Sequence, residues 1–402
     1  MCATALRILA MDAIESANSG HPGVALGLAD VLCVLWRKYI RISPEHLQAA
    51  NRDHFVLSVG HASALYYALL HLAGFPVSIE DLKSFRQLHS ITPGHPERDL
   101  SLGIDVATGP LGQGLANAVG MAAVKLYQAK QQERAPEGHV FAMVGDGCLM
   151  EGISHEACAL ASSLGLGNLV VAWDDNGISI DGPLQPWFAE DVVKRFQAYG
   201  WRVIAAVDGH DVDAIDSAFA QATSSSSVPT LVVFKTRIGY GSDWEGQAIA
   251  HGKPLGSARL AKLREHLQWP HASFEVPDAV YAQWGKLRPQ VSYRMSDATD
   301  CSVDWSDYYQ MLMQDVVPEA TRVSSKRCLA LLLKKCPEVI GGSADLSEST
   351  GVMQESNTVW QPTKPGNFIH FGVREFAMFA MANGMAALGM RPYVSTFLVF
   401  SD

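Results

Sequence analysis

Five short apolar runs, separated by stretches with helical periodicity, constrain the fold of this chain most. The runs are rich in Val, Ile, Phe and Trp and cover residues 55–58, 139–145, 168–173, 201–207 and 230–235. The helical stretches lie at about residues 61–73, 113–134, 151–164, 189–199 and 211–223. Buried strands that alternate with helices form βαβ units and a parallel sheet. We therefore expect an α/β fold with a doubly wound parallel sheet that carries helices on both faces.

A change of pattern near residue 285 predicts a second unit. Residues 285–317 contain Pro, Ser and Asp with little sustained periodicity, so we expect a linker with a short helix there. The segments that follow are a helical stretch at 322–335, strands at 338–346 and 367–372, a helix at 375–388 and a final strand at 392–400. We predict domains at residues 1–284 and 318–402.

The second predicted domain is small for its architecture. Its 85 residues hold three strands, of which the last is apolar and has no helix after it. Small units bury little surface, so three strands that end on an uncovered apolar strand would make a poor independent domain. We therefore expect an incomplete second α/β domain of the same type, truncated after its third strand, with any C-terminal domain absent.

Charge and cysteine content exclude several classes of function. The formal net charge is −10, so a nucleic acid backbone would be repelled. The seven cysteines contain no Cys-x-x-Cys pair, which disfavours a disulfide framework or a zinc ribbon and fits a reducing compartment. No run of about 18 apolar residues occurs. We expect a cytoplasmic protein that binds neither nucleic acid nor membrane.

Two polar turns follow neighbouring predicted strands. Asp146, in the sequence GDG, comes directly after the strand at 139–145, and Asn176, in DDNG, comes after the strand at 168–173. Ligands bind at the carboxyl edge of open α/β sheets, where both side chains are expected. A carboxylate, an amide and a backbone carbonyl suit Mg²⁺ or Ca²⁺, which also take ligands from phosphate. Either turn alone is more often structural, but the pair indicates a metal and phosphate site.

A glycine-rich helix entry, GPLGQGLANAVG at residues 109–120, is a weaker signal. It matches neither the dinucleotide-binding fingerprint nor the P-loop. Free backbone N–H groups at a helix start can nevertheless hold an anion. We expect a second amide-rich edge near the metal site.

Outside the predicted strands, five of the 14 histidines stand next to glycine. They are His21, His61, His95, His210 and His251. A lone histidine is usually structural, but several in glycine-framed loops indicate a basin that handles protons and anions. We discount His210, because Gly-His-Asp is typical of a helix entry in which Asp211 is the cap.

The second domain offers one acid and two aromatic residues. Glu375 lies at a strand-to-helix junction, where its carboxylate could share a proton with a heteroaromatic nitrogen or be an ordinary first-turn acid. Phe397 and Phe400 on the last strand could stack on a cofactor ring or belong to the core. The spacing leaves both questions open.

At these residues the chain resembles transketolases, which use thiamine diphosphate. The GDG and DNG pair resembles the diphosphate and metal motif of thiamine-dependent enzymes in general. The motifs that narrow the resemblance to transketolase are MDAIESANSGHPG, LHSITPGHPE, TGPLGQGLANAVGMA, GDGCLMEGISHEA, DDNGISIDG, KTRIGYGS, GGSADL and FIHFGVREF.

The resemblance implies the thiamine diphosphate-binding fold and a set of cofactor residues. Asp146, Asn176 and the carbonyl of Ile178 would hold Mg²⁺ or Ca²⁺. The residues implied to contact thiamine diphosphate are His61, Gly109, Leu111, Asp146, Gly147, Asn176, His251, Glu375 and Phe397.

The same resemblance implies the reaction. A two-carbon glycolaldehyde unit would pass from a ketose phosphate to an aldose phosphate through the thiamine diphosphate ylid, in the pentose phosphate pathway. Glu375 would bind the pyrimidine nitrogen, and Arg322 and Ser349 would grip the substrate phosphate. The histidines implied to handle substrate hydroxyls and protons are His21, His95 and His251. The active sites of this family lie between subunits, so a homodimer is implied.

The alternatives are related thiamine enzymes and incomplete ones. Dihydroxyacetone synthase and deoxyxylulose-phosphate synthase share the fold, and the chain could also be one half of a two-chain enzyme or a non-catalytic cofactor-binding fragment. The loop at 241–252 departs from the family pattern, because it carries Trp244 and Glu245 and lacks a histidine shortly before His251. Substrate contacts from this loop are therefore in doubt.

Overall fold

A five-stranded parallel sheet forms the centre of the first unit. The computed structural model describes residues 1–286, 304–314 and 318–400. The strand order is β1-β2-β3-β7-β6, and all four pairings are parallel. The strands are β1 (His54–Leu57), β2 (Val140–Gly145), β3 (Leu169–Asp175), β6 (Arg202–Asp208) and β7 (Thr230–Lys235).

Helices cover both faces of this sheet because the strand order reverses once. The chain moves in one direction from β1 to β6 and then returns to place β7 beside β3. Parallel crossovers are right-handed, so the returning α10 (Val212–Ala222) lies on the face opposite the crossover helix α6. It packs on β6 and β7, whereas α6 (Gln113–Gln131) packs on β1, β2 and β3. The predicted doubly wound α/β fold is confirmed.

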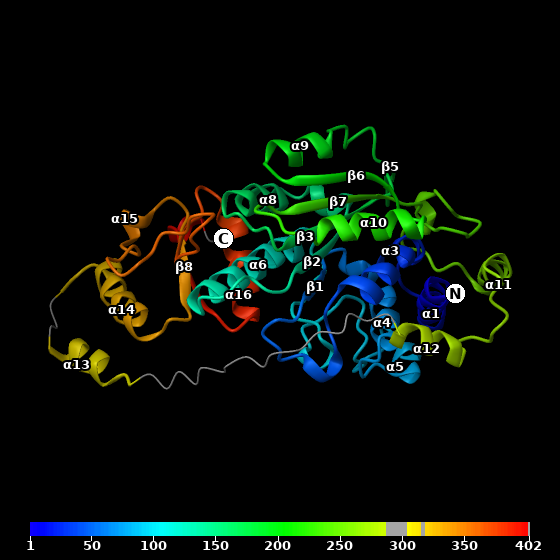
Figure 1. The fold of residues 1–402 in the computed structure, drawn as a ribbon, viewed down its shortest axis with the longest axis horizontal. Coiled ribbons are helices and arrows are strands. Elements are labelled where there is room, and N and C mark those ends of the chain that lie inside the picture. Colours follow the sequence, from blue (N-terminus) through cyan, green and yellow to red (C-terminus); the bar gives the residue numbers. More distant parts are fainter. Residues whose placement is uncertain (287–303, 315–317, 401–402) are drawn as a thin grey trace.

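Further elements surround the sheet (Figure 1). The helices of the first unit, besides α6 and α10, are α1 (Cys2–Ala17), α2 (Pro22–Gly27), α3 (Ala29–Val34), α4 (Ser63–Leu72), α5 (Ile79–Lys83), α7 (Asp146–Met150), α8 (Gly152–Ser163), α9 (Val192–Ala198), α11 (Ser257–His266) and α12 (Asp278–Lys286). A small antiparallel pair joins β4 (Ile178–Ser179) and β5 (Gly182–Pro183).

A three-stranded parallel sheet forms the second unit. Its order is β10-β8-β9. Its strands are β8 (Val339–Ser343), β9 (Phe368–His370) and β10 (Arg391–Ser395), and the helices after residue 303 are α13 (Ser306–Gln314), α14 (Thr321–Lys335), α15 (Ser347–Thr350) and α16 (Glu375–Ala387).

The last strand ends earlier than predicted. Strand β10 pairs with β8 from Arg391 to Ser395, and β8 ends opposite Ser395. The chain then turns into a 3₁₀ segment, Leu398–Phe400. The prediction that Phe397 lies on the strand is therefore wrong. The apolar pattern continues past the point where the neighbouring strand can supply hydrogen bonds.

The two units share one hydrophobic core through the helix pair α6 and α16. Figure 1 shows these helices side by side, and residues of α16 belong to the same buried cluster as the first sheet. A Cβ atom on Gly120 would lie 2.0 Å from the carbonyl oxygen of Met381, and one on Gly384 would lie 2.0 Å from that of Asn117. The backbones can approach this closely only because both residues are glycine.

The predicted linker at residues 285–317 falls largely outside the described residues. Helix α13 lies within it and matches the short helix that was expected there. The domain boundaries stay predictions. In the part of the chain that the structure describes, no helix is long and apolar enough to cross a membrane. The six cysteines described there are all free thiols.

Candidate functional site

The carboxyl edge of the first sheet brings Asp146 and Asn176 together. Gly145 pairs with Asp174 in the register between β2 and β3, so the turns that follow these strands are neighbours. Asp146 is the first residue of α7, and Asn176 follows the end of β3 by one residue. This is the placement that the strand pattern predicts.

Asp146 is a buried carboxylate in an acidic surrounding. Its Oδ1 accepts a hydrogen bond from the Trp173 indole N–H at 3.0 Å, and its Oδ2 accepts one from the Gly177 backbone N–H at 3.2 Å. Burial raises the pKa of Asp146 to about 8, and the nearby carboxylates of Asp174 and Asp175 add to that rise. Negative charge therefore exceeds its local compensation here, which favours binding of a cation.

Hydrogen bonds orient the side chain of Asn176. Its amide nitrogen donates to Asp174 Oδ2 at 2.8 Å, and its Oδ1 accepts from the Ile178 backbone N–H at 3.0 Å. Asp174 also accepts a hydrogen bond from the hydroxyl of Thr236, which begins the loop after β7. The Asn176 oxygen keeps a second lone pair that a metal ion can use.

Four of the glycine-framed histidines form one cluster. The ring of His21 lies 4.9 Å from His61, 6.5 Å from His95 and 5.7 Å from His251, measured between ring centroids. His61 and His251 are 5.0 Å apart. The rings come from four separate segments: the start of α2, the turn after β1, the loop before α6 and the loop after β7. The structure therefore brings four of the five predicted histidines together, and their handling of protons and anions stays a prediction.

The cluster leaves polar atoms without partners inside the described part of the chain. His61 Nε2 and His251 Nδ1 are buried and have no hydrogen-bond partner there. Burial lowers the pKa of His21 to about 4 and holds the pKa of His61 well below its usual range, and the neighbouring histidines add to both shifts. The rings are neutral near pH 7. Buried, unpaired polar atoms are costly, so their presence indicates a bound group.

Arg86 organises one side of the cluster, and the sequence pattern did not single it out. Its guanidinium donates to Ser19 Oγ at 2.9 Å, contacts His21 Nδ1 at 3.4 Å and reaches the Gly94 carbonyl at 3.4 Å. It therefore links the turn that carries His21 to the loop that carries His95. A single arginine has no diagnostic spacing, so only its position between two glycine-framed histidines could have suggested this role.

The glycine-rich helix entry lies against the same edge. A Cβ atom on Gly109 would be 3.5 Å from the ring of His95, and one on Gly147 would be 2.9 Å from Leu111 Cδ1. The structure thus places Gly109 beside the histidine cluster and Leu111 beside Gly147.

The loop at 241–252 is fixed by its own unusual residues. The Trp244 side chain is buried, and the guanidinium of Arg259 lies 4.4 Å from its ring centroid. Glu245 accepts hydrogen bonds from the Arg237 guanidinium at 2.8 Å and the Gly241 backbone N–H at 2.7 Å. The two residues that depart from the family pattern therefore fix the loop, mainly through arginines on either side of it.

The remaining predicted residues lie in the second unit. Arg322, Ser349 and Phe397 line one open hollow of about 1120 Å³ between α14, α15 and the end of β10. Phe397 is 44 % exposed and stacks on Phe400, which rules out the core alternative for this residue. Glu375 is half-buried at the start of α16.

The structure does not join these two groups. No hydrogen bond, ion pair or ring contact among the described residues connects Glu375, Arg322, Ser349 or Phe397 to the four histidines or to Asp146. Within one chain the predicted site residues form two separate sets.

Protein-family comparison gives two matches that together span the chain. Residues 1–325 match the transketolase thiamine diphosphate-binding domain, and residues 318–402 match the transketolase pyrimidine-binding domain. Transketolase 1 of Vibrio cholerae is 46% identical over 435 residues, which cover 100% of this chain and 65% of that protein. The chain therefore spans about two thirds of the length of such relatives.

Solved structures give the same result. Transketolase from Leishmania mexicana is 35% identical with a TM-score of 0.89, and the match covers 99% of this chain and 64% of that one. A complex of Pichia stipitis transketolase with sedoheptulose-7-phosphate is 37% identical with a TM-score of 0.87, and it covers 100% of this chain and 64% of that one. By sequence and by fold, this chain belongs to the transketolase family.

Proposed function

We propose that the chain builds a thiamine diphosphate site and takes part in ketol transfer, in which a two-carbon glycolaldehyde unit passes from a ketose phosphate to an aldose phosphate. The observation that carries the proposal is the carboxyl edge of the first sheet, where the buried Asp146 follows β2, His61 follows the neighbouring β1, and two ring nitrogens of the histidine cluster lack partners within the described residues. The sugar phosphate in the related yeast structure supports the substrate class.

The metal would sit at Asp146. No three or more His, Cys, Asp or Glu side chains gather into a metal-binding group within the described residues. A cation would therefore take the Asp146 carboxylate, the Asn176 amide oxygen, the Ile178 carbonyl and oxygens of the cofactor diphosphate. Such an oxygen set suits Mg²⁺ or Ca²⁺, and the excess negative charge at Asp146 fits either ion.

The histidines would act on the cofactor and the substrate. His61 and His251, with Gly109, Leu111 and Gly147, would contact the cofactor beside the metal. Neutral imidazoles can both donate and accept hydrogen bonds, so His21, His95 and His251 suit the transfer of protons to and from sugar hydroxyls. Thiamine diphosphate, when bound, supplies the carbon nucleophile that holds the two-carbon unit between donor and acceptor.

The second set of residues would come from a second copy of the chain. Arg322 and Ser349 line the same hollow as Phe397, which suits a phosphate beside an aromatic ring. Glu375 would meet the pyrimidine ring. Because no hydrogen bond, ion pair or ring contact joins this set to the histidines within the described part of one chain, we propose a homodimer with sites between the subunits. A cytoplasmic location and a place in the pentose phosphate pathway belong to the same proposal.

Cofactor binding and ketol transfer are tested separately. Millimolar thiamine diphosphate with Mg²⁺ is expected to raise the melting temperature, and a ligand at 100 times its Kd stabilises the folded state by about 2.7 kcal/mol. Transfer is measured with sedoheptulose-7-phosphate as donor and a short aldose phosphate as acceptor. A chain that melts at the same temperature with and without cofactor and metal contradicts the proposal.

A further inference from the structure

The sequence pattern assigned His210 to a helix entry. In the structure its ring contacts Asp30, Arg237 and Tyr240. Asp211 does cap α10, as predicted, through hydrogen bonds from the backbone N–H groups of Asp213 and Ala214. The His210 side chain is nevertheless only 7% exposed. It stacks on Tyr240 with 3.9 Å between ring centroids and 12° between ring planes. A helix entry alone requires neither this burial nor this stacking.

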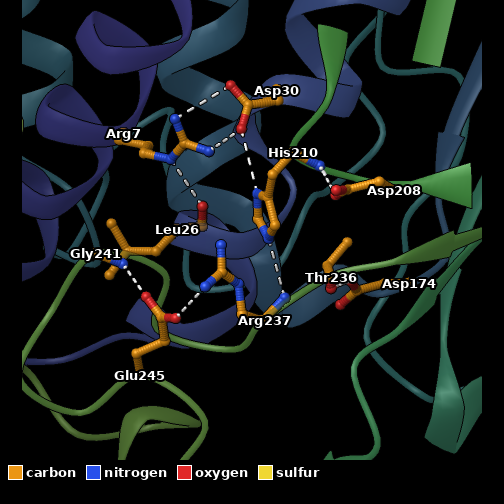
Figure 2. Close-up of polar contacts among 10 residues, drawn as sticks. All are labelled: Arg7, Leu26, Asp30, Asp174, Asp208, His210, Thr236, Arg237, Gly241 and Glu245. Atoms are coloured by element: carbon orange, nitrogen blue, oxygen red, sulfur yellow. Dashed lines mark hydrogen bonds and ion pairs between the residues drawn. The ribbon is translucent and has the colours of Figure 1, made fainter. Parts of the chain in front are cut away.

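The hydrogen bonds of His210 fix its tautomer. Nε2 lies 3.1 Å from the backbone nitrogen of Arg237, which is a donor, so Nε2 must be the unprotonated acceptor. The ring proton is then on Nδ1, which lies 3.3 Å from Asp30 Oδ2 (Figure 2). Asp30 in turn is bound by the guanidinium of the buried Arg7. His210 thus connects α3 to the loop after β7.

The loop that His210 holds carries two parts of the proposed site. At its start, Thr236 donates to Asp174, which orients Asn176. Further on, the backbone N–H of Gly239 donates to the Gly23 carbonyl at 3.0 Å, beside the turn of His21. The loop ends at His251 in the histidine cluster. The Arg237 backbone, which His210 binds, lies between these points of attachment.

We propose that His210 is a positioning residue for the site at the sheet edge. Acting through the backbone N–H of Arg237, it fixes residues 236–251 so that His251 and Asn176 face the same bound group. It touches neither the cofactor nor the substrate. The inference rests on the proposed function for its purpose, but its geometry can be tested without any ligand. Groups that hydrogen-bond a liganding residue directly typically change affinity by about 10- to 100-fold, and His210 lies further away, so we expect an effect at the lower end of that range.

Two substitutions separate the two hydrogen bonds of His210. In His210→Asn the amide nitrogen can reach Asp30 in place of Nδ1, but no acceptor remains for Arg237. In His210→Gln the amide oxygen can replace Nε2 as the acceptor for Arg237. The proposal predicts that His210→Asn displaces the loop and that His210→Gln largely restores it.

The matched control is His71, which also has both ring nitrogens engaged. Its Nδ1 lies 2.7 Å from the Val77 carbonyl and its Nε2 lies 2.8 Å from the Tyr281 hydroxyl. It lies in the last turn of α4, outside the histidine cluster. His71→Asn is expected to lower stability by an amount similar to His210→Asn and to leave the site unchanged.

The first readout is the NMR resonance of the His251 ring in the full chain without ligand, with selectively labelled histidine. A shifted or broadened resonance in His210→Asn, with a wild-type resonance in His210→Gln and His71→Asn, supports the proposal. An unchanged resonance in His210→Asn, or the same change in the Gln and Asn variants, overturns it.

The second readout is affinity for thiamine diphosphate with Mg²⁺, measured by calorimetry. His210→Asn is expected to weaken binding about tenfold, whereas His210→Gln stays within about threefold of wild type. Wild-type affinity in His210→Asn overturns the inference. A wild-type chain that binds no cofactor overturns the proposed function instead, and the ring resonance then decides the role of His210.

Discussion

The two ends of strand β1 carry histidines in opposite situations. His54, the first residue of the strand, is buried, and its Nδ1 lies 2.8 Å from Asp105, which also binds the buried Arg52. His61, just past the other end, is also buried at Nε2 but has no partner for that atom within the described residues. Burial lowers the pKa of both rings. Two desolvated rings with different pairing thus distinguish a structural histidine from one that we propose contacts a ligand.

The largest expected effect on stability comes from removing Asp105, the partner of His54. Asp105→Ala leaves the His54 ring without its acceptor and the buried Arg52 guanidinium without its counter-ion, although Arg52 still donates to the carbonyls of Leu47 and Asp53. Loss of one partner of a buried ion pair typically costs about 3–5 kcal/mol. We expect the free energy of unfolding to fall by that amount in urea denaturation, while the soluble variant binds thiamine diphosphate normally. A loss below about 1 kcal/mol would show that this end does not carry the stability assigned to it.

Asp146→Ala, at the carboxyl edge of the sheet, is expected to weaken ligand binding without lowering stability. Metal-dependent binding of thiamine diphosphate should weaken by about 100-fold or more, because the cation loses its only carboxylate ligand. Stability without ligand should stay level or rise, because a buried carboxylate with acidic neighbours is removed. Calorimetry with and without Mg²⁺ measures the first effect, and urea denaturation measures the second. Retained metal-dependent binding would refute the assignment of Asp146.

Substituting the two histidines in parallel sharpens the comparison further. His61→Ala should weaken cofactor binding about tenfold, or about 1.4 kcal/mol, with little change in stability. His54→Ala should lower stability by about 1–3 kcal/mol, because Asp105 loses a buried donor, and should leave binding unchanged. If both variants change only cofactor affinity, or both change only stability, the contrast between the two ends of β1 is wrong.

The smallest expected effect is a dependence of stability on pH. The pKa of His21 is about 4 in the folded chain, against an ordinary value of 6.5. Between pH 6.5 and pH 4 the unfolded chain binds a proton that the folded chain does not, so stability falls as the pH is lowered through this window. Because His21 is only partly buried, we expect His21→Gln to reduce the fall by about 1 kcal/mol.

Urea denaturation of wild type and His21→Gln at pH 7 and pH 4 measures this difference. His54, whose pKa is also about 4, contributes a second fall in the same window, so His54→Gln is the matched variant. Parallel pH profiles for wild type and His21→Gln would show that His21 is not the neutral, desolvated ring inferred from its surroundings.

Much of the first unit could be predicted because its signals are local. Each apolar run became a strand within about two residues at either end, and the parallel pairing of β2 with β3 then forced Asp146 and Asn176 to one edge. The histidine cluster required tertiary structure, because four loops meet there and glycine neighbours give no distances. Its members were predicted, but their contacts were not.

The failures have physical causes of the same kind. Phe397 was assigned to a strand because an apolar pattern does not record where the neighbouring strand ends. Arg86 and His210 were missed because each acts through tertiary hydrogen bonds to distant segments. His210 also stands beside a genuine cap, so a correct local explanation concealed its second role.

The backbone contact between α6 and α16 has a consequence for motion. At Gly120 and Gly384 the two helices touch main chain to main chain, so no side chain can rotate to let one slide past the other. A hinge between the two units would first have to pull these backbones apart and open a shared core. We therefore expect the units to tumble as one rigid body, and a bulky ligand to enter through rearrangement of surface loops instead of through domain opening.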